Sequence, residues 1–340
     1  MMCSVRVFEP GPLTTIQDKG RRRFQRFGMP VAGAMDLFSY RVANLLVGND
    51  EGAAVIEFTL QGPKLEFLED SIIAVTGAEV VPLLDNQPMP LWQSVFVGKG
   101  SIVSFQPFKS GLRGYLAISG GIKIPQVMGS TATYLRAQIG GLEGRKIIAG
   151  DIIPVEEALA KEAIKDGRYR RLPNNLIPAY KNTEEIMVTL GPQDDMFKDE
   201  SIKTFLTSEY QITVQSDRMG YRLKGPNIEH LDKADIISDG IPPGAIQVPG
   251  DGQPIILLAD RQTVGGYTKI ATVISTDLNK LAQLTPGSKV TFKAVTLDEA
   301  YEALEAQESI ISQVEELAIS IASRKAYKLR IDGREYTVSV

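Results

Sequence analysis

The stretch at 72–118 reads IIAVTGAEVVPLLDNQPMPLWQSVFVGKGSIVSFQPFKSGLRGYLAI, and it decides the fold class. It contains four short apolar runs, at 72–75, 94–97, 102–105 and 115–118. Each run is bounded by Gly, Pro, Asp or Asn, and runs of that length with that punctuation predict strands rather than helices. The whole chain holds 31 Gly and 19 Pro, which is typical of turn-rich barrels and sandwiches. The sequence therefore predicts a mainly β protein.

A few helices interrupt this pattern. Residues 35–47 have apolar residues near helical spacing and end at Gly48-Asn49, which is a C-terminal stop signal. Residues 277–284 follow the capping types Ser275-Thr276. The longest predicted helix runs over 297–323 and has acidic residues near its start, as the helix dipole favours. The last residues alternate around Asp332-Gly333 and predict a hairpin.

The chain changes character in its middle. Between 156 and 171 it becomes charged and helical, and a segment rich in Pro and Asn follows before the next strand run. The pattern L-x-G-P-x-x-E occurs at 60–66 and again at 223–229, which hints at a duplication. We therefore predict two similar β domains, at 1–170 and 171–340.

Bulk composition excludes several classes of protein. The net charge of −4 gives no electrostatic reason to expect a nucleic-acid partner, because phosphate binding needs a clustered basic excess. No stretch approaches the roughly 18 apolar residues of a membrane span, and no secretory signal is visible. The single cysteine, Cys3, excludes a disulfide framework and fits a reducing cytoplasm.

The single histidine, His230, also narrows the chemistry. It lies in a polar context, and a Ser-His-Asp triad would need that residue in a pocket. The common zinc sites need further His or Cys ligands, so we expect no metal. Acid–base chemistry then falls to Asp, Glu, Lys, Tyr or a partner subunit.

Three loops in the first half are candidate binding segments. The loop at 14–21 places Asp18 beside cations that include Arg21, although a solvated turn explains the same residues. Asp36 follows a small-residue loop at a predicted helix start, where it either helps to bind a ligand or, as we favour on sequence grounds, caps the helix. A third loop ends a strand with amides that can approach a ligand closely or simply form a hairpin turn; its residues are Ser119, Gly120 and Gly121.

Two loops in the second half carry more polar residues than turns require. Asp217 and Arg218 follow a strand, where Arg218 could fork onto a carboxylate or phosphate. Asp217 could be an acid–base group or could orient Arg218. A buried strand then delivers Asp260 and Gln262 into a loop, which is a common way of building a site. Further candidates for substrate binding around this loop are Gln247, Thr263, Gly265, Gly266 and Tyr267.

Some expected motifs do not occur. The phosphate-binding pattern G-x-x-x-x-G-K-[ST] is missing, so any ATP is not held by a standard Walker loop of this chain. No Met-Lys-Met signal is present, so we expect no covalent biotin on this chain.

The ordered loops resemble those of the allophanate hydrolase subunit 2 family, also called the biotin-dependent carboxyltransferase or KipA-like family. The matching motifs include T-T-I-Q-D-K-G-R at 14–21, Y-L-A-I-S-G-G-I at 115–122, S-D-R-M-G-Y-R-L at 216–223 and D-R-Q-T-V-G-G-Y at 260–267. Val264 and Thr268 depart from the family pattern, which has Thr and Pro there. These two departures bear on which substrate is bound. They do not alter the resemblance to the family.

The resemblance implies two cyclophilin-like β-barrel domains. It also implies a role as one subunit of an ATP-dependent 5-oxoprolinase, which hydrolyses 5-oxo-L-proline to L-glutamate together with a B-type, KipI-like subunit and an A-type subunit. ATP would act at the level of that complex. In this hypothesis Arg218 binds a carboxylate or phosphate, Asp217 or Asp260 is the acid–base group, and Gln262 with the amides of the glycine pair orients the amide.

Two other functions remain open from the sequence. The first is a biotin-dependent carboxyltransferase subunit that acts on urea or a similar small amide. The second is a regulatory protein that binds a KipI-type kinase inhibitor. Catalysis by the assembled complex distinguishes the regulatory function from both enzymatic ones.

Overall fold

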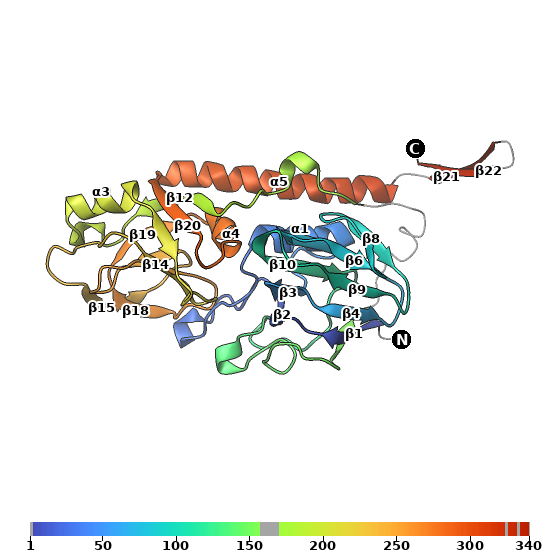
Figure 1. Ribbon diagram of the computed structural model, residues 1–340, viewed down its shortest axis with the longest axis horizontal. Coiled ribbons are helices and arrows are strands. Elements are labelled where there is room, and N and C mark those ends of the chain that lie inside the picture. Colours follow the sequence, from blue (N-terminus) through green and yellow to red (C-terminus); the bar gives the residue numbers. More distant parts are fainter. Residues whose placement is uncertain (1–2, 157–169, 324–325, 332–333, 340) are drawn as a thin grey trace.

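The computed structural model describes residues 3–156, 170–323, 326–331 and 334–339. Two β-rich units lie side by side, and the long helix α5 (Leu297–Ser323) runs along both of them (Figure 1). Among these residues, no helix combines the length and the apolar character that crossing a bilayer requires.

The first unit consists of two sheets around one hydrophobic core. The six-stranded sheet has the order β11 (Ile152–Val155), β1 (Cys3–Glu9), β4 (Lys64–Phe67), β9 (Ile102–Phe105), β6 (Pro82–Leu84) and β7 (Gln87–Pro88). The five-stranded sheet has the order β2 (Leu13–Gln17), β3 (Val55–Thr59), β10 (Ser110–Ile118), β5 (Ser71–Glu79) and β8 (Ser94–Val97).

The five-stranded sheet is buried on both faces, which explains its continuous apolar runs. Leu116 of β10 points into the core between the sheets, whereas its neighbours Tyr115 and Ala117 pack with helix α1 (Leu37–Val47). A strand covered on both sides needs no polar alternation. Helix α1 therefore positions β10 from outside, and β10 carries a site residue described below.

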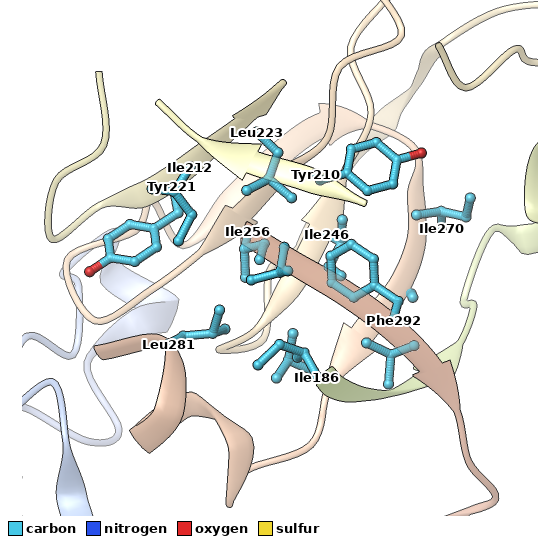
Figure 2. Close-up of a cluster of buried hydrophobic side chains, with 14 of the residues drawn as sticks. Ile186, Tyr210, Ile212, Tyr221, Leu223, Ile246, Ile256, Ile270, Leu281 and Phe292 are labelled. Atoms are coloured by element: carbon cyan, nitrogen blue, oxygen red, sulfur yellow. The ribbon is translucent and has the colours of Figure 1, made fainter. Parts of the chain in front are cut away.

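The second unit is a closed barrel with its own core. Its strands follow the order β12 (Thr183–Leu190), β19 (Lys269–Val273), β16 (Ala245–Gln247), β17 (Ile255–Leu257), β14 (Gly220–Lys224), β13 (Tyr210–Ile212) and β20 (Lys289–Ala294). Figure 2 shows side chains such as Ile186, Ile256 and Phe292 converging inside it. Helix α4 (Asp277–Ala282) adds Leu281 to this core, and Met35 reaches it from the first unit.

The remaining elements lie outside these sheets. Helix α3 (Asp199–Thr207) packs on β20, a two-stranded ribbon pairs β15 (Asp235–Gly240) with β18 (Val264–Tyr267), and β21 (Ala326–Ile331) pairs with β22 (Arg334–Ser339). Short 3-10 turns occupy 25–27, 135–137, 174–176 and 194–196.

The predicted fold class is confirmed, since the chain is mainly β with helices α1, α3, α4 and α5 among its described residues. The second half closes as a barrel, and the two packed sheets of the first half are consistent with a second barrel-like domain. The three predicted helices and the final hairpin are also present, although the expected turn at 332–333 lies outside the described residues. Helix α3 was not predicted, because nine residues give too short a periodic signal.

The division at 170/171 remains a prediction, and the expected helical segment at 156–171 lies almost wholly outside the described residues. Strand β11 ends at Val155 and β12 begins at Thr183. Leu172 packs in the same cluster as helix α1, and so do Ile311 and Val314 of α5. The long helix thus belongs to the second half by sequence but also stabilises the first.

The repeated L-x-G-P-x-x-E pattern has a common packing explanation. A Cβ atom at Gly62 would lie 2.3 Å from the ring of Phe105, and one at Gly225 would lie 2.4 Å from the ring of Tyr210. Real Cβ atoms do not approach a ring so closely. In each half, the glycine therefore allows an aromatic side chain to lie directly against the turn.

Candidate functional site

A cavity of about 650 Å³ lies between the two units and is lined by residues of both. The barrel contributes the turn at 216–219 and Asp260, and the first unit contributes Thr59, Arg113 and Arg136. A volume of this size suits a small ligand. The structure thus brings the 216–219 turn and Asp260 to one cleft.

Arg218 is the centre of a buried ion cluster in the wall of this cavity. Its Nε and Nη2 groups donate to the two carboxylate oxygens of Asp260, each over 3.1 Å. Nη2 also donates to the carbonyl oxygen of Gly33 over 2.6 Å, and Nη1 donates to Oε1 of Glu57. A guanidinium has five N–H groups, and these contacts use four of them. One N–H of Nη1 therefore remains for a ligand, and the bidentate contact fixes the plane of the Asp260 carboxylate.

The charges in this cluster shift its titration. Burial raises the pKa of Asp260, against the opposing effect of Arg218, and the nearby charge of Glu57 raises it further. Burial disfavours the charge on Arg218, but Asp260 and Glu57 outweigh that effect and raise the pKa of the guanidinium. Two buried carboxylates share one guanidinium here, so Asp260 takes up a proton more readily than an exposed aspartate does.

A second buried network joins the units beside this cluster. Arg113 of β10 donates from Nη1 to the hydroxyl of Tyr221 over 2.8 Å and to the carbonyl oxygen of Ala282 over 2.5 Å. Gln283 accepts from the backbone N–H groups of Leu112 and Arg113, each over 3.0 Å. The Nε atom of Arg113 is buried and has no hydrogen-bond partner among the described residues. Arg113 thus lines the cavity and ties the two units together, while its Nε atom stays enclosed in the protein.

Two charged residues lie at the edge of the cavity. Arg136 is exposed, contacts the sulfur of Met219 over 2.5 Å, and forms no ion pair among the described residues. Asp217 accepts from the backbone N–H groups of Met219 and Gly220, over 2.7 and 3.3 Å. Asp217 therefore holds the turn that presents Arg218, and its exposed carboxylate also borders the cavity.

Asp18 and Arg21 act one layer behind the cavity. Asp18 accepts from Ser130 Oγ over 2.6 Å and from the N–H and hydroxyl of Thr131 over 2.6 and 3.0 Å. Arg21 is fully buried and donates to the carbonyl oxygens of Val127 and Ala132. Neither residue lines the cavity. Both connect the loop at 14–21 to the segment at 127–132, which leads directly to the cavity residues at 134–136.

Asp36 caps helix α1, as the sequence favoured. Its carboxylate accepts from the N–H of Ser39 over 2.9 Å, from the Ser39 hydroxyl over 2.6 Å and from Gln283 Nε2 over 2.8 Å. Burial raises the pKa of Asp36, and the hydrogen bonds from Ser39 oppose that rise. Asp36 lies outside the cavity described above, so a contact to the same substrate stays only a prediction.

The third candidate loop, at 119–121, lies at the opposite end of β10 from Arg113. Ser119 follows Arg113 by six positions along this extended strand, which corresponds to roughly 20 Å. The N–H of Gly120 donates to Asn49 Oδ1 over 2.8 Å, and that of Gly121 donates to the Ile118 carbonyl oxygen over 2.9 Å. The structure therefore does not bring these amides to the cavity.

The chain turns sharply after Asp260, so the rest of the 260–267 loop leads away from the cavity. Gln262 is exposed, and the residues that follow it enter the β15–β18 ribbon. Gln247 is buried and donates from Nε2 to the carbonyl oxygen of Tyr267 over 3.3 Å. None of these residues lines the cavity, nor do Thr263, Gly265 and Gly266, so their roles in substrate binding remain predictions.

Sequence reasoning missed three residues of the site, namely Glu57, Arg113 and Arg136. Glu57 stands inside the apolar run Val55-Ile56-Glu57-Phe58, and a carboxylate in a fully buried strand is costly without a partner. That signal could have identified it. Arg136 lies in the short 3-10 turn at 135–137, and no local pattern marks it.

Known proteins resemble this chain over most of its length. The family model described as "Carboxyltransferase domain, subdomain A and B" matches residues 27–294, a range that ends with the last barrel strand, β20. The C-type subunit of the 5-oxoprolinase of Escherichia coli strain K12 is 37% identical over 310 residues, which cover 91% of this chain and 97% of that protein.

Larger fungal proteins contain a similar segment. The urea amidolyase of Saccharomyces cerevisiae is 34% identical over 330 residues, covering 92% of this chain and 18% of that protein. The crystal structure of the K. lactis urea amidolyase superposes with a TM-score of 0.87 and 31% identity, covering 92% of this chain and 20% of that chain. The chain thus spans nearly all of the bacterial relative and a small part of each fungal one.

Proposed function

Because this chain belongs to the carboxyltransferase domain family, subdomains A and B, we propose that it is the C-type subunit of an ATP-dependent 5-oxoprolinase. The complex would hydrolyse 5-oxo-L-proline to L-glutamate, and the chain would act in it with an A-type and a B-type subunit. The observation that carries this proposal is the cavity between the units, where Arg218 holds the carboxylate of Asp260. The correspondence with nearly all of the bacterial relative supports the same activity.

The cavity offers complementary groups for such a substrate. 5-Oxoproline carries a carboxylate and a lactam, and Arg136 at the edge is a cation without an ion-pair partner among the described residues. We assign the substrate carboxylate to Arg136 and the lactam to Asp260. With its raised pKa, Asp260 can donate a proton to the lactam oxygen and accept one from the nitrogen.

Arg218 then has a different role from the one the sequence suggested. Most of its N–H groups bind Asp260, Glu57 and Gly33, so it is first a positioning residue for Asp260. Its remaining Nη1 N–H is a further donor that a bound amide could use.

ATP would act at the level of the complex, where it would supply the driving force by phosphorylating the stable amide. This chain has no Walker loop, so we assign no nucleotide contact to its residues. The lining of the cavity does not include Gln247, Gln262 or the 263–267 segment. We therefore assign these residues no position against the substrate. We place the complex in the cytoplasm, on the basis of the single cysteine.

A specific observation favours one alternative. The fold superposes closely on a segment of a urea amidolyase, with a TM-score of 0.87. Urea is also a small amide, and Asp260 could bind its N–H groups. In this second proposal the chain would be a carboxyltransferase subunit that works with biotin on a separate carrier.

Reconstitution separates the two proposals. The three subunits are co-expressed, and glutamate is measured with 5-oxoproline in the presence and absence of ATP. We expect ATP-dependent glutamate from the complex. Biotin-dependent carboxylation of urea, without glutamate release from 5-oxoproline, would instead establish the alternative.

A substitution in the same complex tests the substrate orientation. Arg136→Gln should raise KM for 5-oxoproline about tenfold or more, because a charge-assisted hydrogen bond is lost, while kcat changes less. Arg222→Gln removes an exposed cation of the barrel outside the cavity and is the matched control. An unchanged KM in Arg136→Gln would refute the assignment of the carboxylate.

A further inference from the structure

A second cavity, of about 370 Å³, lies beside the first and is lined by the chain next to Asp260. Its charged lining residues are Lys19, Arg22 and Arg261, and no Asp or Glu lines it. Leu258 and Ala259 line the second cavity, whereas Asp260 lines the first. The two cavities are therefore separate, although one short segment of the barrel contributes to both.

Arg261 is the unusual member of this set. It is only 5% exposed, and its Nε and Nη1 groups donate to the carbonyl oxygens of Ile241 and Leu258, over 2.9 and 3.1 Å. Among the described residues, its Nη2 group makes no hydrogen bond and no carboxylate pairs with it. Burial lowers the pKa of Arg261 to about 10, and no neighbouring acid offsets that effect.

A buried cation without a counter-charge is costly, because it has lost water and gained no anion in return. The carbonyl contacts hold the guanidinium in place but do not neutralise it. Arg22 and Lys19 add further positive charge at the same cavity, and both are exposed. The electrostatics of the cavity are thus complementary to an anion.

We infer that this second cavity binds a small organic anion, with its carboxylate or phosphate head on Arg261 and Arg22 and an apolar body against the remaining wall. The apolar wall consists mainly of Val31, Leu37, Leu258 and Leu278. A planar guanidinium with free N–H groups matches both kinds of oxyanion. This site does not depend on the proposed 5-oxoprolinase activity.

Thermal unfolding of the full chain tests this inference. The probes are phenyl phosphate, benzoate and inorganic phosphate, with benzylamine as a cation of similar shape. At a concentration of about 100 times Kd, phenyl phosphate or benzoate should raise Tm by about 4 °C. The relative shifts distinguish a phosphate head from a carboxylate head. Inorganic phosphate should act more weakly because it has no apolar body, and benzylamine should give no shift.

Substitutions assign the shift to the cavity. Arg261→Met should weaken the effective probe about tenfold or more. It should also leave Tm without probe unchanged or higher, because it removes an unpaired buried charge. Arg22→Met, at an exposed position, should reduce the shift even if Arg261→Met does not fold. Arg23→Met removes the exposed charge next to Arg22 in the sequence, outside the cavity, and should keep the full shift.

Three results would overturn the inference. The first is no Tm shift of the native chain with any of the anions. The second is an anion shift that Arg261→Met or Arg22→Met retains in full. The third is an equal shift with benzylamine, which would show that the cavity binds the ring and ignores its charge.

Discussion

Replacing Arg218 by methionine should expose the energetics of the buried cluster. The substitution keeps much of the side-chain volume but leaves Asp260 and Glu57 buried without their guanidinium. Breaking a buried ion pair by removing one partner costs about 3–5 kcal/mol. Folded proteins are stable by about 5–15 kcal/mol, so the variant should fold and yet unfold at a clearly lower urea concentration.

The stability that Arg218→Met loses should depend on pH in a defined direction. Burial already raises the pKa of Asp260, so the folded state holds that proton more tightly than the unfolded chain does. The stability from this proton is fully present below the unfolded pKa of about 4 and is lost as pH rises through the folded pKa. Without Arg218, the pKa of Asp260 in the folded state rises further, so the stability that its proton contributes is lost only at a higher pH, nearer neutrality. The deficit relative to the native chain should therefore shrink as the pH falls from about 8 to about 5.

Urea unfolding followed by circular dichroism at several pH values measures this deficit. Adding Glu57→Gln to Arg218→Met removes one uncompensated charge and should restore at least about 1 kcal/mol at neutral pH. A deficit that is the same at every pH, or a second substitution that simply adds its own cost, would refute the shared-charge reasoning.

Further substitutions test the layers around the site. Asp36→Ala removes the cap of α1 and the contact from Gln283, and should lower the free energy of unfolding by about 2 kcal/mol in urea titration; an unchanged midpoint would argue against the cap. Gly140→Ala would place a Cβ 2.1 Å from Arg21 Nη2 at a φ of +68°, and should lower Tm by several degrees, whereas Gly150→Ala, where no atom lies within 4 Å, controls for positive φ alone. Met35→Ala should cost about 2–5 kcal/mol by calorimetry, because the side chain packs in the barrel core from the other unit; a loss below about 1 kcal/mol would contradict that packing.

Local signals predicted most of the fold. Asp36 and Gly48 bracket helix α1, and both act within a few residues: one accepts from Ser39 N–H, and the other adopts a φ of 80°. The apolar runs of the first half became buried strands, because a sheet covered on both faces requires such runs. Features that depend on near neighbours are therefore readable from sequence.

The candidate site was only partly predictable. The local sequence marks Arg218 and Asp260, because charged residues that directly follow a strand are typical of sites built on loops. Their partner Glu57 lies 161 residues from Arg218, and only the packing of the two units brings them together. The direction of the chain after Asp260 likewise depends on the packing of the barrel. No local pattern therefore shows that Asp260 lines the cavity and that the residues at 262–267 do not.

Glutamate release by the reconstituted complex carrying Asp260→Asn tests the role of the cavity most directly. The amide keeps the size of the side chain but cannot transfer a proton as the carboxyl group does. We expect ATP-dependent glutamate formation to fall by about 100-fold or more, while Asp277→Asn, at a buried aspartate outside the cavity, retains activity. Near-normal glutamate formation by an intact Asp260→Asn complex would contradict the account.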